Sequence, residues 1–191
     1  MKQQTSFQRT LAFIVIGIGL IAVGVAAMTL LTLRHSLWSQ AERAVGSSVV
    51  PAKADYPAPD LTLNDLDGNP RSLSDYLGQV ALVNMWATWC PPCVEELPTL
   101  NSFYNDYAVE GFVIIGIDDG EELGVVKDYV AQQGLIFPIW VDPSYLSERA
   151  FNTMNLPSSF LIDRQGQVRL QWVGAISRAM LEKYVLPIIE E

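Results

Sequence analysis

The two cysteines of the chain, Cys90 and Cys93, stand three residues apart in the stretch NMWATWCPPCVEELP. A structural zinc site needs four ligands, and His35 is the only histidine that could join them. A disulfide that closes so short a loop removes little entropy from the unfolded chain, so it is a poor structural staple. We therefore expect a redox-active pair, with no metal and no cofactor.

A strand and a helix are predicted on either side of this pair. The apolar run VALVNMW, residues 80–86, is too short for a typical helix and is expected to be a buried strand. A helix is predicted to follow Cys90, with Pro91 and Pro92 in its first turn, where amides have no intrahelical acceptor. The helix N-terminus favours a thiolate and can lower the pKa of a C-x-x-C cysteine from about 8.5 to between roughly 3.5 and 7.5. Cys90 is thus predicted to be the attacking sulfur, and Cys93, one turn inward, the resolving one.

The rest of the chain from residue 60 alternates between strand-like and helix-like segments. A hairpin is predicted around Asp67-Gly68, further strands at FVIIGI and FPIWVD, and a second hairpin from SSFLID and QVRLQWV. Helices are predicted at VEELPTLNSFYNDYA, LGVVKDYVAQQG and SYLSERAFN, and a last one, SRAMLEKYVLPII, starts at Ser177. This alternation predicts an α/β fold with a mixed central sheet flanked by helices.

An apolar segment of 23 residues without charge, Leu11 to Leu33, precedes this domain. As a helix it would be about 34 Å long, enough to cross a hydrocarbon core of roughly 30 Å. The apolar part of a cleaved secretory signal is shorter, about 7 to 15 residues, so an uncleaved transmembrane anchor is expected. Lys2, Arg9 and the terminal amine precede the segment, and Arg34 and Arg43 follow it, which gives a slight bias toward a cytoplasmic N-terminus.

The predicted organisation has four parts. Residues 1–10 form a short cytoplasmic N-terminus, residues 11–33 the anchor in the lipid bilayer, residues 34–55 a flexible linker, and residues 56–191 the α/β domain. The linker lacks sustained periodicity and leads into VVPAKADYPAP, whose prolines favour extended backbone.

The domain is acidic, with seven Lys/Arg against nineteen Asp/Glu from Asp60 onward. This balance argues against nucleic acid or an anionic membrane surface as a partner of this part of the chain. Its simplest consequence is solubility.

Several stretches resemble a thioredoxin-fold protein: WATWCPPC after an apolar strand, Pro98 five residues past the second cysteine, and LPSSFLIDRQGQV downstream. The stretch APDLTLNDLDGNPRSLSDYLGQVALVNMWATWCPPC resembles the membrane-anchored TlpA-like and ResA-like thiol-disulfide oxidoreductases of the redoxin (AhpC/TSA) superfamily, near the cytochrome c maturation branch. The resemblance extends from about Tyr56 to the C-terminus. It implies a thioredoxin-like fold with an N-terminal β-hairpin extension.

The same resemblance implies a protein-disulfide reductase on the extracytoplasmic side of the cell membrane. Its substrates would be thiols and disulfides of exported proteins, apocytochrome c among them, and its partner a membrane electron donor of the thiol-disulfide relay type. Two other classes stay open, a thiol peroxidase of the redoxin group and a copper-delivery protein of the same fold. The copper protein would need a histidine in the domain, and none follows His35.

The resemblance also assigns roles to further residues. Pro157 falls at the family's cis-proline, which leaves the backbone of Leu156 free to pair with an extended substrate. Glu96 matches a glutamate near the active site that is a candidate for proton transfer; equally open is a helix-turn carboxylate that, like Glu95, complements the helix dipole. Asn84 stands where plain thioredoxins have a buried aspartate, which leaves the acid-base role to Glu96 or water.

Weaker substrate contacts are predicted for Trp89, Pro91, Pro92 and Leu156. Trp86, which belongs to the buried strand, is expected to be a core residue.

Overall fold

The computed structural model describes residues 28–29 and 48–191, and residues 48–191 form a compact domain. Apart from Met28 and Thr29, which are helical, the anchor predicted at residues 11–33 lies outside the described residues, as does the linker up to residue 47. Within the described ranges, no helix has the length and apolar character to span a bilayer.

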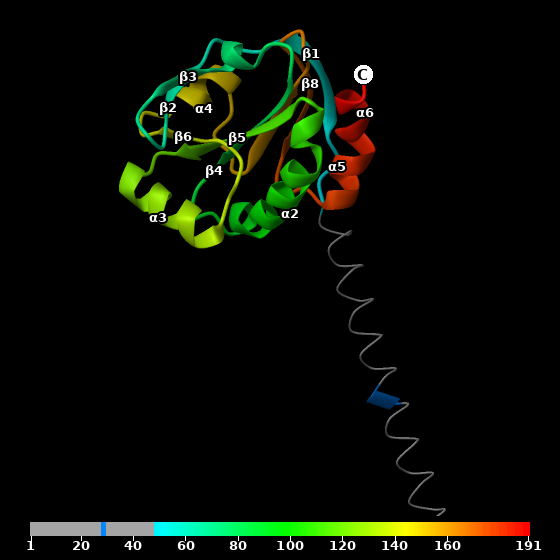
Figure 1. The fold of residues 1–191 in the computed structure, drawn as a ribbon, viewed down its shortest axis with the longest axis horizontal. Coiled ribbons are helices and arrows are strands. Elements are labelled where there is room, and N and C mark those ends of the chain that lie inside the picture. The colour runs from blue at the N-terminus through cyan, green and yellow to red at the C-terminus, as the bar shows by residue number, and fades with distance from the viewer. Residues whose placement is uncertain (1–27, 30–47) are drawn as a thin grey trace, which may run out of the picture. The chain divides into compact units, whose positions relative to one another are not determined.

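The domain is built on an eight-stranded sheet with the order β1-β8-β7-β4-β5-β6-β2-β3 (Figure 1). Its strands are β1 (Ala52–Pro57), β2 (Thr62–Asp65), β3 (Pro70–Ser72), β4 (Val80–Trp86), β5 (Phe112–Asp119), β6 (Ile139–Asp142), β7 (Ser158–Ile162) and β8 (Gln167–Val173). The central strands β4, β5 and β6 pair in parallel, and the other pairings are antiparallel. The sheet is therefore mixed, as predicted.

Helices cover both faces of this sheet. They are α2 (Pro91–Tyr107), α3 (Leu123–Gln133), α4 (Leu146–Phe151), α5 (Arg178–Tyr184) and α6 (Leu186–Ile189), with the 3-10 turns η1 (Leu73–Tyr76) and η2 (Ala108–Glu110). Because side chains alternate along a strand, Val80 and Leu82 of β4 join one apolar cluster with α2, α5 and α6, whereas Ala81 and Val83 join another with α4. Two cores, one on each face, thus hold the sheet.

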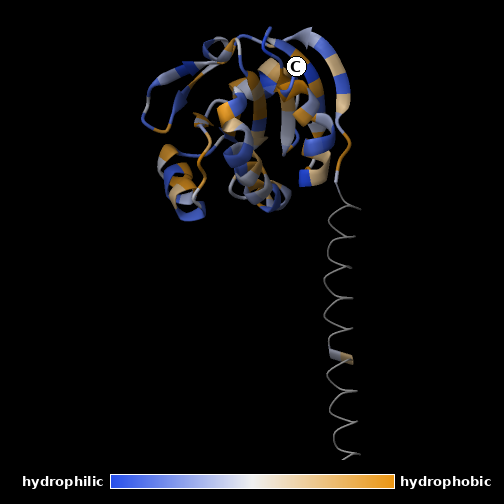
Figure 2. Ribbon diagram, turned by 45° about the vertical axis from the view of Figure 1, so that its right-hand side comes forward, coloured by the Kyte–Doolittle hydropathy of each residue, from blue (hydrophilic) through white to orange (hydrophobic). Residues whose placement is uncertain are grey.

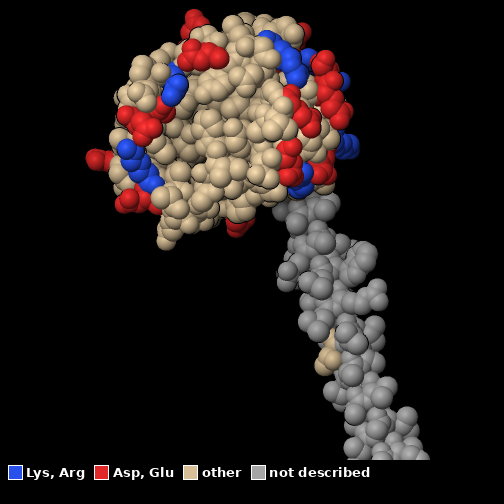
Figure 3. All heavy atoms as spheres, viewed as in Figure 1, with Lys and Arg blue, Asp and Glu red and all other residues tan. Residues whose placement is uncertain are grey.

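The distribution of residue types follows these layers. In Figure 2 the hydrophobic residues lie mainly in the interior strands, and the helices alternate between hydrophobic and hydrophilic residues. On the face seen in Figure 3, acidic and basic side chains lie along the sides of the domain, and its middle carries neither.

The ordered domain starts earlier than the predicted boundary at residue 56. Strand β1 includes four residues of the predicted linker and pairs with β8, with Ala52 opposite Gln171 and Tyr56 opposite Val168. The Tyr56 hydroxyl also donates to Gln171 Oε1 at 2.8 Å. The prolines do not prevent this pairing, because β1 is an edge strand, where proline is tolerated.

The predicted C-terminal helix is two helices. Ser177 is the N-cap of α5, as expected, but α5 ends at Tyr184 and a separate short helix, α6, follows. Pro187 lies in the first turn of α6, where its missing N–H leaves the Lys183 carbonyl without its usual helical partner.

Candidate active site

Cys90 and Cys93 lie where β4 gives way to α2, and they form a disulfide. Cys90 is the N-cap of α2: its backbone is extended, and its Sγ accepts the Cys93 N–H at 3.3 Å. Pro91 and Pro92 occupy the first turn, as predicted, and both are exposed. Cys90 retains 4% exposure, whereas Cys93 is fully buried, so a molecule arriving from solvent reaches Cys90 first.

The peptide bond between Leu156 and Pro157 is cis, in agreement with the prediction. Strand β7 follows it directly and runs antiparallel to β4, with Ser158 opposite Met85. Pro157 therefore lies at the end of β4 from which the chain leaves for Cys90. The Pro157 carbonyl accepts the Gly174 N–H at 2.8 Å, which fixes this segment to the end of β8.

Glu96 is buried on α2, with 2% of its surface exposed. Its Oε1 accepts the Asn84 Nδ2–H at 2.8 Å, and its Oε2 accepts the Ile176 N–H at 3.0 Å. Burial raises the pKa of Glu96 to about 7, although both hydrogen bonds act in the opposite direction. Glu95 is exposed, so the two glutamates are not equivalent, and a solvent-facing role for Glu96 is excluded.

Asn84 supports this carboxyl group from the strand. It is fully buried, and its Nδ2 donates to Ser159 Oγ at 3.0 Å in addition to Glu96. Its Oδ1 has no hydrogen-bond partner among the described residues. Asn84 thus joins the buried Glu96 carboxyl group of α2 to Ser159 of β7.

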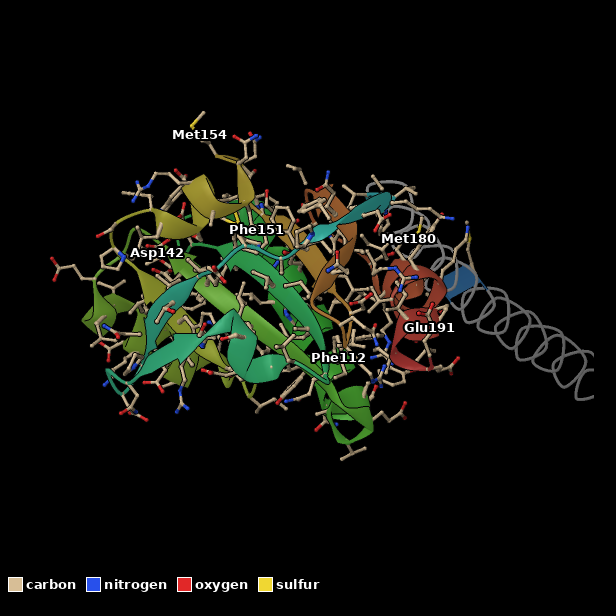
Figure 4. The ribbon with its side chains drawn as sticks, turned by 90° about the horizontal axis from the view of Figure 1, so that it is seen from above. Phe112, Asp142, Phe151, Met154, Met180 and Glu191 are labelled. Atoms are coloured by element: carbon tan, nitrogen blue, oxygen red, sulfur yellow. A yellow bond between two sulfur atoms is a disulfide. The ribbon has the colours of Figure 1, made fainter. Side chains whose placement is uncertain are left out.

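Two of the residues predicted to contact substrate, Trp89 and Leu156, are accessible at the surface. Trp89 is 66% exposed beside Cys90, and Leu156 is partly exposed, so both are open to a bound polypeptide. Met154, which precedes Pro157 by three residues, is 84% exposed and points away from the domain (Figure 4). Trp86 is a core residue, as expected, with its ring 5.6 Å from that of Tyr129.

Three residues at this site were not predicted: Glu121, Ser159 and Ile176. Glu121 binds the loop before Cys90, through the backbone and hydroxyl groups of Thr88. Ile176 contributes only its backbone N–H, for which no side-chain pattern exists. The sequence does hold a signal for Glu121: it stands among Asp118, Asp119 and Glu122, and acidic side chains at the end of a buried strand are unusual.

Comparisons with known proteins agree with this geometry. The AhpC/TSA family model matches residues 54–171. The chain is 33% identical over 184 residues to the thiol-disulfide oxidoreductase ResA of Geobacillus kaustophilus, covering 96% of both chains. It is 37% identical to the ResA protein of Bacillus anthracis over 131 residues, which cover 69% of this chain and 76% of that one. Among solved structures, a thiol:disulfide interchange protein from Chlorobium tepidum superimposes with a TM-score of 0.65 at 35% identity, covering 72% of this chain and 99% of the other.

Proposed function

The chain belongs to the AhpC/TSA family and is a thiol-disulfide oxidoreductase, and from this premise we propose that it reduces disulfides of exported proteins, apocytochrome c among them. The observation that carries the redox cycle is the arrangement of the two sulfurs, with Cys90 at the helix N-terminus and Cys93 buried behind it.

In the forward cycle, the Cys90 thiolate attacks one sulfur of a substrate disulfide. A mixed disulfide forms, and the other substrate sulfur leaves as a thiolate, which takes up a proton. Cys93 then loses its proton and attacks Cys90 Sγ, which releases the second substrate sulfur. The enzyme now holds the Cys90–Cys93 disulfide, and the substrate has gained two electrons and two protons.

Glu96 is the group that takes the proton from Cys93. It lies three residues further along α2, on the same side of the helix, and it is buried like Cys93. A carboxyl group whose pKa is about 7 exchanges protons readily near neutral pH. Substrate backbone pairs with Leu156 beside the cis-proline, while Trp89, Pro91 and Pro92 contact its side chains.

Residues 11–33 anchor the protein in the cell membrane, with the domain on the extracytoplasmic side. This part of the proposal is supported by the uncharged 23-residue segment and by the similarity to ResA over nearly the whole chain. A membrane-bound thiol-disulfide relay protein would return the electrons to the Cys90–Cys93 disulfide.

The direction of transfer is tested with a peptide that carries the C-x-x-C-H sequence of an apocytochrome c in its disulfide form. The reduced protein should generate free peptide thiols and become oxidised in equal amounts, as measured by mass spectrometry of the quenched mixture. The Cys90→Ser variant should generate none. If the oxidised protein instead oxidises the dithiol peptide, the reductase proposal is wrong.

A further inference from the structure

The loop that carries the chain from β4 to Cys90 is held by a side chain from a distant part of the sequence. The carboxylate of Glu121 accepts the Thr88 N–H on Oε2 at 2.6 Å and the Thr88 hydroxyl on Oε1 at 2.7 Å. Both donors belong to one residue, two positions before Cys90, and hydrogen bonds to an ionised acceptor are stronger than neutral ones. The Cys90 N–H closes the same loop by donating to the Ala87 carbonyl at 3.2 Å.

The sheet brings these two segments together. Strands β4 and β5 are parallel neighbours, with Trp86 opposite Asp118, so the loops that follow them leave the same edge of the sheet. Gly120 turns the chain toward α3 with a φ of +90°, and a Cβ there would collide with the Tyr145 ring. The position of Glu121 is therefore set by the backbone of its own turn.

The backbone of Glu121 is bound by a buried carboxyl group. Asp118 is fully buried, its Oδ1 accepts the Glu121 N–H at 3.2 Å, and its Oδ2 has no hydrogen-bond partner in the described part of the chain. Burial first, and the Glu121 carboxylate next, raise the pKa of Asp118 to about 8, so Asp118 is largely neutral near pH 7. Burial raises the pKa of the Tyr129 hydroxyl group on α3, and the Glu121 carboxylate raises it further.

We propose that Glu121 is a positioning residue for the attacking sulfur: through Thr88 it fixes the loop that sets Cys90 Sγ at the N-terminus of α2. The Cys90 thiolate is stabilised there by the Cys93 N–H, a contact that depends on the loop. If the loop is released, Cys90 leaves this position more often, and its thiolate becomes less favourable. The inference rests on the proposed function only in that Cys90 is the attacking thiol.

The test measures the rate at which iodoacetamide alkylates Cys90 in the full chain, in a Cys93→Ser background. Thr88→Val removes the hydroxyl donor without changing any charge, and it should slow alkylation about fivefold near pH 7. Thr88→Ser keeps the hydroxyl and should restore the parent rate. Glu122→Ala, which removes the exposed carboxylate next to Glu121, is the matched control and should have no effect.

Two substitutions of Glu121 separate the hydrogen bonds from the charge. Glu121→Gln keeps an oxygen for the Thr88 N–H and an N–H for the hydroxyl, so alkylation should be as fast as in the parent or faster, because a negative charge is lost. Glu121→Ala loses both contacts and should be slower than Glu121→Gln by about tenfold.

Alkylation of Thr88→Val at the rate of Thr88→Ser would overturn the proposal, and so would equal rates for folded Glu121→Ala and Glu121→Gln. If Glu121→Ala fails to fold, the comparison of alkylation rates between Thr88→Val and Thr88→Ser is sufficient to test the proposal. Alkylation needs no protein substrate, so the two proposals can fail separately. If these alkylation rates are found but the protein reduces no exported protein, the role of Glu121 stands and the proposed function is wrong.

Discussion

At the level of single residues, Cys90 and Cys93 differ in their access to solvent, and this difference can be tested. Cys93→Ser should accumulate mixed disulfides through Cys90, because the resolving sulfur is gone while the attacking one can still be reached. Cys90→Ser should accumulate almost none, since Cys93 is fully buried. Non-reducing electrophoresis of cell extracts quenched with acid measures both. Equal trapping by the two variants would refute the assigned roles.

Glu96 gives a second prediction at this scale. If its carboxylate accepts the Cys93 proton, the rate at which a Cys90 mixed disulfide is resolved should rise as pH increases through about 7, and Glu96→Gln should remove that inflection. The variant can keep the local hydrogen bonds: the Asn84 amide can turn so that its unpartnered Oδ1 accepts from Gln Nε2. Stopped-flow measurement of the resolution rate against pH is the test.

Glu95→Gln is the control for this experiment, because Glu95 is exposed on the same helix and should leave the pH profile unchanged. If Glu96→Gln keeps the inflection of the wild type, the proton leaves Cys93 through water and Glu96 has no part in the transfer.

At the level of elements, the strand and helix that carry the cysteines were predictable because their signals are local. All seven residues of VALVNMW are buried, which explains why an unbroken apolar run indicated β4. Two prolines after Cys90 marked the first turn of α2, where proline fits. Local patterns likewise predicted the hairpin of β2 and β3 and the helices α3 and α4.

The contacts that complete the site were not predictable, because they join distant parts of the chain. Glu96 receives the N–H of Ile176 across a separation of 80 residues, and Thr88 binds Glu121 across 33. Such pairs depend on which strands become neighbours, and sequence periodicity carries no information about that. Strand β1 was missed for a similar reason, since its pairing with β8 decides its conformation.

Helix α2 must be held firmly against the sheet for the cysteines to keep their place, and Phe103 is the residue that tests this. Phe103 is fully buried, its ring lies 5.5 Å from that of Phe112 on β5, and the Arg178 guanidinium of α5 lies 5.0 Å above it. Phe103→Ala should lower the free energy of unfolding by about 3 to 5 kcal/mol in urea denaturation. Val109→Ala, at a position that is 91% exposed, should change it by less than about 0.5 kcal/mol. Similar values for the two variants would contradict the packing described for α2.

At the level of the whole molecule, the proposed topology places the domain outside the cytoplasm. An alkaline phosphatase fused after Glu191 should be active, because that reporter needs an oxidising compartment for its disulfides. A fluorescent protein that matures only in the cytoplasm should stay dark at the same position. An inactive phosphatase with a bright fluorescent fusion would reverse the orientation and remove exported proteins from the possible substrates.

The stability of the domain as a whole should fall as pH rises toward 8. Burial is the first cause that raises the pKa of Glu96 to about 7, of Asp119 to about 7 and of Asp118 to about 8, above reference values of 4.5, 3.8 and 3.8. The folded state therefore binds more protons than the unfolded state between these limits. Its extra stability is complete below about pH 4 and is lost as pH rises through about 7 to 8.

This trend can be measured without interference, since the domain has no histidine and the oxidised cysteines do not titrate. Asp65 acts in the opposite sense, because hydrogen bonds from its own turn first, and from Arg71, lower its pKa to about 2. The stability that Asp65 contributes is lost only as pH falls below about 4, outside the pH range in which Glu96, Asp118 and Asp119 act. The free energy of unfolding of the oxidised protein should thus be greatest near about pH 4 to 5 and should decrease steadily to pH 8. Glu96→Gln should flatten the slope between about pH 4.5 and 7, with a change of about 3 kcal/mol as the upper limit for a shift from 4.5 to about 7, and Glu95→Gln should leave it unchanged. A free energy of unfolding that is flat or rising from pH 5 to 8 would mean that these carboxyl groups are ionised in the folded protein, and the proton-transfer role of Glu96 would lose its basis.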